Sequence, residues 1–144
     1  MKLTELTPEQ LEFRLLELPA LIADVSGRLT ALRAEKRTLE RTLEGIEAAS
    51  HTSALSMEDY KALRNAEDRK AFLRMRLEAN ENWQAKMHRL EQLQATIEKY
   101  NAEREQFDDE HKSIRATLEG RYAQIIEKAL TDAMLTNAVR RVAA

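Results

Sequence analysis

The sequence contains no cysteine, three glycines, two prolines and few aromatic residues. Without cysteine, the chain can form neither disulfides nor thiolate metal sites. A β-sheet protein of this length would need many more turn residues than these glycines and prolines supply. The apolar runs are only a few residues long, so we expect no membrane-spanning segment. No signal peptide is visible near the start of the chain, and the expected location is therefore cytoplasmic.

The residues that are abundant are those of long helices. About a third of the 144 residues are charged, and Ala, Leu, Glu and Arg are among the commonest residues. This mixture is typical of coiled coils. We therefore expect an all-α fold, a long helical hairpin or coiled coil with short flanking N- and C-terminal helices. The length is enough for a single helical domain over residues 1–144.

Local signals divide this domain into segments. Thr7, Pro8 and Gln10 predict a capping box with proline at the first helical position. Pro19 is expected to end the first helix, and Gly120 to end the longest one. The expected elements are a short helix at 8–18, a helix at 20–48, a loop at 49–56 that ends in the cap Ser56, a long helix at 57–119 with a kink near 80–82, and a C-terminal helix at 122–141.

Apolar residues recur at seven-residue intervals in the second half of the chain, which indicates a coiled-coil seam. In the helix at 20–48 a similar pattern is interrupted by Lys36, and a polar residue at such a position can fix the pairing register. That helix covers only about half of the long one, so we expect a homo-oligomer to bury the rest. The predicted oligomer seam consists of Trp83, Leu90, Leu93, Ile97, Tyr100, Phe107, Ile114, Leu118 and Ile125.

The charges are distributed unevenly. Residues 61–89 carry eight basic and four acidic side chains, whereas residues 91–110 carry seven acidic and two basic ones. A basic segment of this kind can follow a phosphate backbone, and Tyr60, Phe72 and Trp83 are close enough in sequence to stack on bases. Mixed charge is also the normal solvated surface of a coiled coil, and the charges alone favour that interpretation. The candidate DNA-binding residues are Arg33, Lys36, Arg37, Arg41, Lys61, Arg64, Arg69, Lys70, Arg74 and Arg76.

No pattern of catalytic residues is present. The sequence has no Gly-rich phosphate loop, no serine-nucleophile motif and no dinucleotide-binding fingerprint. Its three histidines have no partner at metal-ligand spacing. We therefore predict a protein that is not an enzyme and that has no cofactor and no metal site.

One segment carries a resemblance. Residues 56–73 read SMEDYKALRNAEDRKAFL, and this resembles a stretch in small helical phage proteins, where a capped helix start precedes a basic-Asn-Ala-Glu-x-Arg-x-Ala run. The layout is similar to that of the recombination mediators of T-even phages, which are small helical oligomers. The rough counterparts of that family's helix start and tryptophan are Ser56, Met57, Asp59, Tyr60 and Trp83.

The resemblance implies a DNA recombination accessory protein of bacteriophage type. Such a protein binds single-stranded DNA as an oligomer and helps to load a recombinase onto DNA covered by single-strand-binding protein. The location would then be the host cytoplasm. The alternative is a structural or assembly coiled coil, an adaptor or scaffold that binds protein and not DNA.

Overall fold

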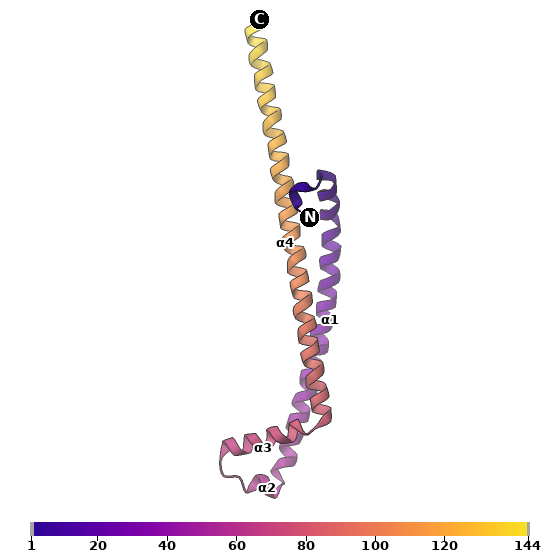
Figure 1. Cartoon of the computed structure of the whole chain (residues 1–144), viewed down its shortest axis with the longest axis vertical. Helices are drawn as coiled ribbons and strands as arrows, with labels where there is room; N and C mark the ends of the chain where they lie inside the picture. Colours follow the sequence, from indigo (N-terminus) through magenta and orange to yellow (C-terminus); the bar gives the residue numbers. More distant parts are fainter. Residues whose placement is uncertain (1, 144) are drawn as a thin grey trace. The chain divides into compact units, whose positions relative to one another are not determined.

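A computed structural model describes residues 2–143, and every regular element in that range is a helix. The predicted all-α class is therefore confirmed. The elements in chain order are the 3₁₀-helix η1 (Leu3–Glu5) and the α-helices α1 (Pro8–Leu55), α2 (Glu58–Lys61), α3 (Ala66–Glu78) and α4 (Glu81–Ala143). Figure 1 shows α2 and α3 as the short helices that connect the two long ones.

The chain divides into two compact units. Unit 1 consists of Met1–Val25 and Glu103–Ala144, and unit 2 consists of Ser26–Ala102. Each long helix contributes residues to both units. The expectation of one helical domain over residues 1–144 stays a prediction.

Helix α1 begins as its sequence predicts. Thr7 Oγ1 accepts a hydrogen bond from the Gln10 backbone N–H at 3.2 Å, and Gln10 Oε1 accepts one from the Thr7 N–H at 2.9 Å. Pro8 is the first helical residue, where its missing N–H has no helical partner to lose. The predicted capping box is confirmed.

In unit 1, α1 and α4 run antiparallel. Glu12 of α1 pairs with Tyr122 of α4, and Arg14 pairs with Glu110, so residue numbers rise along one helix as they fall along the other. The buried core between them consists of Leu11, Leu18, Ile114 and Leu118, and the partly buried residues packed against it are Leu3, Leu6, Leu15, Leu21 and Phe107.

The predicted helix end at Pro19 was wrong, because α1 continues through this residue without a break. A proline inside a helix loses one backbone hydrogen bond and costs roughly 3 kcal/mol relative to alanine. Leu18 next to it is fully buried in the unit 1 core. Burial of leucine side chains on both sides of Pro19, at about 1.5–3 kcal/mol each, outweighs that cost.

In unit 2, α1 and α4 are antiparallel as well. Arg28 donates to the Tyr100 hydroxyl at 3.2 Å, and Arg89 reaches Glu35 at 2.7 Å. The buried leucine and isoleucine side chains of this unit are Leu29, Leu43, Leu93 and Ile97.

The loop predicted at 49–56 was also wrong, because α1 remains helical to Leu55. Within this segment, the Thr52 hydroxyl donates to the Ala48 carbonyl at 3.0 Å. Ala54 is fully buried, which holds the segment in place. Ser56 does not cap α2, because its hydroxyl donates to the Ser53 carbonyl instead.

The single long helix predicted at 57–119 is divided into α2, α3 and the first part of α4. Asn65 caps α3 by accepting a hydrogen bond from the Glu67 N–H at 2.8 Å, and this side chain favours a new helix start over a continuous helix. The kink expected near 80–82 coincides with a real break. There, Asn80 accepts from the Trp83 N–H at 3.1 Å.

The helix end expected at Gly120 was wrong, because α4 continues to Ala143. A glycine costs a helix only about 1 kcal/mol. Arg121, the next residue, donates to the carbonyls of Leu6 and Thr4 and so ties this turn of α4 to the N-terminal segment. The predicted helix at 122–141 is therefore the last part of α4.

Candidate nucleic-acid interface

The candidate basic residues on α1 are mostly engaged within the chain. Arg33 donates to Asn101 of α4 at 3.0 Å, and the half-buried Lys36 pairs with Glu40 at 3.6 Å. Arg37 donates to the Arg33 carbonyl at 3.4 Å. Arg41 is exposed and makes no ion pair or hydrogen bond with the described residues. Within this group, Arg33 contacts α4, whereas the partners of Lys36 and Arg37 lie on α1 itself.

Apart from Arg69, the exposed basic residues from Lys61 to Arg74 have fewer contacts with other helices than Arg33 has. Lys61 pairs with Glu58 at 3.4 Å, and Arg74 pairs with Glu78 at 2.9 Å, both on the exposed surface of their own helix. Exposed pairs of this kind contribute less than about 1 kcal/mol and exchange readily for other anions. Among residues 2–143, neither Arg64 nor Lys70 has any charged or hydrogen-bonding partner.

Arg69 has a structural role instead. Its Nε donates to the Leu63 carbonyl at 3.0 Å, and its guanidinium lies 5.7 Å from the centre of the Tyr60 ring. Tyr60 also packs against Phe72, with ring centres 5.7 Å apart, and has only 8% of its surface exposed. The contacts hold α2 against α3. They also correct the expectation that Tyr60 stacks on bases, because its ring is already buried.

Trp83 also contacts another helix. Its indole N–H donates to Glu47 of α1 at 3.3 Å, and the side chain is half-buried. Whether Trp83 stacks on bases stays a prediction. The aromatic residues of this unit join helices to one another.

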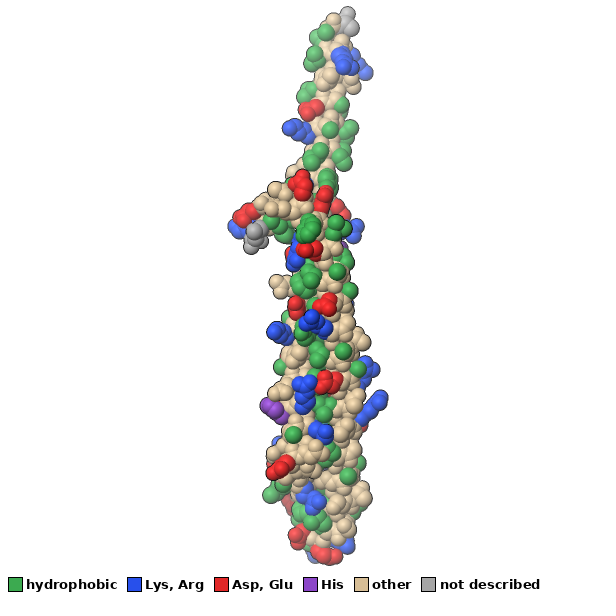
Figure 2. Space-filling view, turned by 90° about the vertical axis from the view of Figure 1, so that its right-hand side faces the viewer, with side chains coloured by type: hydrophobic (Ala, Val, Ile, Leu, Met, Phe, Trp, Pro, Cys, Tyr) green, Lys and Arg blue, Asp and Glu red, His purple; other side chains and the backbone are tan. Residues whose placement is uncertain are grey.

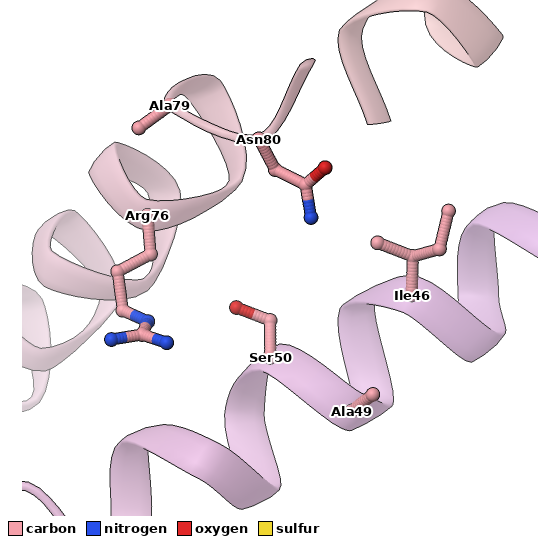
Figure 3. Close-up of a pocket in the computed structure, with 6 residues that line it drawn as sticks. All are labelled: Ile46, Ala49, Ser50, Arg76, Ala79 and Asn80. Carbon is pink, nitrogen blue, oxygen red and sulfur yellow. The ribbon is translucent and has the colours of Figure 1, made fainter. Parts of the chain in front are cut away.

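Arg76 connects α3 to the end of α1. Its guanidinium donates to Ser53 Oγ at 3.4 Å and to the Met57 sulfur, while its buried Nε has no partner among the described residues. Figure 3 shows Ser50 and Ile46 of α1 pointing toward Arg76 and Asn80 across an open cavity of about 470 Å³. This arginine therefore serves packing more than ligand binding.

The structure divides the ten candidate residues into two groups. Arg33, Lys36, Arg37 and Arg41 lie on α1, whereas the other six lie on α2, α3 and their connection. Over residues 61–76 there are six basic side chains and two acidic ones, Glu67 and Asp68. The second group is the more strongly basic surface.

The predicted oligomer seam is largely used inside the chain. Leu93, Ile97, Ile114 and Leu118 are buried, and Trp83, Leu90, Tyr100 and Phe107 are half-buried. Four of the nine residues are therefore buried within the chain, and the assignment of the seam to contacts between chains stays a prediction. The physical reason for this burial is that α1 has 48 residues and covers more of α4 than a helix at 20–48 would. Only Ile125, with 61% of its surface exposed, remains open.

Two contacts in unit 1 had no signal in the sequence. Arg14 donates to both Glu110 oxygens at 2.7 and 3.0 Å, and Tyr122 donates to Glu12. The partners lie about a hundred positions apart, and only the register of the two helices brings them together. The capping role of Asn65, in contrast, has a local signal in the Asn65-Ala66-Glu67 sequence.

Within residues 2–143, no group of three or more histidine, aspartate or glutamate side chains is arranged to hold a metal ion. No helix in the same range is both long and apolar enough to cross a membrane. No family model, curated protein or solved structure matches the chain.

Proposed function

We propose that the protein is a non-enzymatic DNA recombination accessory protein that binds single-stranded DNA through residues 61–76, the basic segment. As a homo-oligomer, it would assist the loading of a recombinase onto DNA covered by single-strand-binding protein. The observation that carries the DNA-binding part is the excess of six basic over two acidic side chains in this segment. The resemblance of residues 56–73 to phage recombination mediators supports the recombination part.

The binding mode follows from which side chains are accessible. Arg64 and Lys70 are exposed and unpaired among the described residues, and Lys61 and Arg74 are held only by exposed ion pairs. Tyr60 is buried, so we expect binding through phosphates and little preference for base sequence.

Fluorescence anisotropy with a labelled single-stranded oligonucleotide across a salt series tests this proposal. The double variant Arg64→Gln and Lys70→Gln removes the two unpaired cations. We expect binding to weaken by about tenfold or more and the slope of log affinity against log salt to fall by about two.

A matched control is available in unit 1. Lys2→Gln with Lys112→Gln changes the net charge by the same amount at two other exposed positions. Binding of this control should remain within about twofold of the unaltered chain, because the change in overall charge is screened at moderate salt. Absence of binding to the unaltered chain at low salt, or equal weakening of both double variants, would refute the DNA-binding proposal.

The second candidate is a structural or assembly adaptor that binds protein and not DNA. The large apolar side chains of α4 from Ile125 onward favour this candidate, because each has more than half of its surface exposed. A group of exposed apolar side chains on one segment marks an interaction site. Self-association without any binding of single-stranded DNA would support the adaptor over the recombination protein.

A further inference from the structure

Helix α4 extends past the part of it that the chain itself covers. In unit 1, Arg121 donates to the Leu6 carbonyl at 2.8 Å, and Tyr122 donates to Glu12. From Tyr122 to Ala143 every side chain is exposed. Figure 2 shows hydrophobic side chains on this C-terminal part of α4, which lies at the top of the picture. The large apolar ones are Ile125, Ile126, Leu130, Met134, Leu135, Val139 and Val142, each with more than half of its surface exposed.

The first part of this apolar surface continues the face that packs on α1. Ile114 and Leu118 are buried against α1 in the unit 1 core. Steps of three and four residues keep side chains on one face of a helix. From Ile114 and Leu118, such steps lead to Ile125, Leu135 and Val139, with Arg121, Lys128 and Asp132 at the positions between them. The uncovered face is therefore an extension of an interface that already exists within the chain.

We infer that residues 122–142 of α4, the C-terminal segment, pair with the same segment of a second copy in an antiparallel arrangement. In unit 1 the natural partner of this face is an antiparallel helix, α1. The C-terminal segment of a second copy, running antiparallel, would pack on the part of α4 that extends past the start of α1. Because both copies use the same surface, the contact is two-fold symmetric and closes as a dimer.

The charges at the two ends of the C-terminal segment favour the antiparallel over the parallel arrangement. Glu5 ends η1, and Glu9 and Glu12 lie at the start of α1. Glu9 and Glu12 act electrostatically on Tyr122, the residue of α4 beyond which α1 no longer covers it. Arg140 and Arg141 lie in the last turn of α4. An antiparallel overlap brings these arginines of one copy to the acidic start of α1 in the other. A parallel overlap would place the four arginines together and leave the glutamates without them, which is unfavourable.

The inference deepens the homo-oligomer part of the proposed function and is independent of DNA binding. Sedimentation of the full chain without DNA therefore tests it separately. A failure here leaves the anisotropy result standing, and a failure of DNA binding leaves the sedimentation result standing.

Two exposed side chains form a matched pair for this experiment. Ile125, seven residues after Leu118, and Met134 have 61% and 73% of their surfaces exposed. They are nine residues apart, about two and a half turns, so they lie on opposite sides of α4. Because both are exposed, neither substitution disturbs the core of the single chain.

Analytical ultracentrifugation over a concentration series gives the dissociation constant of the dimer. We expect Ile125→Lys to weaken the dimer by about tenfold or more, because a lysine would be buried in the interface. Met134→Lys should change the constant by less than about threefold. Circular dichroism checks that both variants remain helical. A chain that is monomeric up to about 100 µM, a very weak affinity for a specific dimer, overturns the inference. Equal effects of the two variants also overturn it.

The absence of cysteine makes the direction testable. A disulfide requires Cα atoms within about 7 Å. In an antiparallel overlap of residues 122–142, position 132 lies on the contact face at the two-fold axis, and position 139 lies far from its own copy. Asp132→Cys should therefore form a disulfide-linked dimer on oxidation, and Val139→Cys should not. Efficient cross-linking through Val139→Cys would show a parallel pair and would refute the antiparallel arrangement.

Discussion

At the scale of single residues, the Arg14–Glu110 pair joins α1 to α4 by two hydrogen bonds with N···O distances of 2.7 and 3.0 Å. Their side chains are 33% and 28% exposed. The hydrogen bond to Glu110 is the main cause that raises the pKa of the Arg14 guanidinium above its usual value. A bidentate and partly buried pair of this kind is stronger than an ordinary surface ion pair.

We predict that Glu110→Gln lowers the free energy of unfolding by about 1 kcal/mol, because the charge and one of the two hydrogen bonds are lost. Urea denaturation at low salt measures this change. Glu119→Gln is the control, since Glu119 pairs with Arg115 on the exposed surface of α4 and should change stability by less than about 0.5 kcal/mol. Similar losses in the two variants would contradict the structural role of Glu110.

Tyr122 is the second residue whose environment has a measurable consequence. Its hydroxyl donates to Glu12, and this hydrogen bond is the largest cause that raises the pKa of Tyr122 above its ordinary value of 10.0. Desolvation and the negative charges of Glu12 and Glu9 act in the same direction. The neutral phenol is favoured in the folded chain, so its contribution is present below about pH 10 and is lost as pH rises through the raised pKa.

We predict that Glu12→Gln lowers the pKa of Tyr122 toward its ordinary value, because the charge that disfavours the phenolate is removed. The phenolate absorbance of Tyr122 is obtained by subtracting the titration of the Tyr122→Phe variant. Glu58→Gln, a substitution in unit 2, should leave that titration in place. An unchanged Tyr122 titration in Glu12→Gln would disprove the contact.

At the scale of elements, the two prolines of α1 occupy contrasting positions. Pro8 is the first helical residue, and Pro19 lies in the helix interior. Proline suits the first position and removes a hydrogen bond in the interior. The same helix therefore contains one proline that favours its start and one that weakens its middle.

We predict that Pro19→Ala raises the free energy of unfolding by about 1–3 kcal/mol, because Pro19 is exposed and alanine restores the missing backbone hydrogen bond. Pro8→Ala is the control and should change stability by less than about 1 kcal/mol, because no helical bond is gained there. Urea denaturation of both variants, with far-ultraviolet circular dichroism as the signal, provides the comparison. A destabilising effect of Pro19→Ala would indicate that α1 is not continuous at this residue.

At the scale of the whole molecule, the sequence predicts the class of fold better than the helix boundaries. Composition and seven-residue periodicity correctly indicate long helices, and the capping box at Thr7 is visible as a local motif. The helix ends predicted at Pro19 and Gly120 were wrong. The free energy that each residue costs its helix is smaller than the gain from burying Leu18 and from the hydrogen bonds of Arg121. Those gains depend on residues about a hundred positions away, which no local pattern reveals.

The sequence predicts the basic composition of the candidate site, but it does not predict which of these side chains are free of contacts within the chain. The basic excess of residues 61–76 is visible in the sequence. The structure adds that Arg69 and Arg76 hold helices together, whereas Arg64 and Lys70 are exposed and have no partner among the described residues. The distinction depends on Tyr60 and Ser53, and sequence spacing alone does not select these partners.

Gly120 lies in α4 just before the point where the cover by α1 ends, and its Cβ position faces open space. An isolated helix of about twenty residues is only marginally stable in water, and a glycine at its base lowers the cost of local unwinding. Backbone amides beyond Gly120 should therefore exchange with deuterium faster than those around Ile114 in the single chain. Association would slow that exchange, so the helix–coil equilibrium of this segment would be coupled to assembly, and any change that stiffens the helix would tighten the dimer.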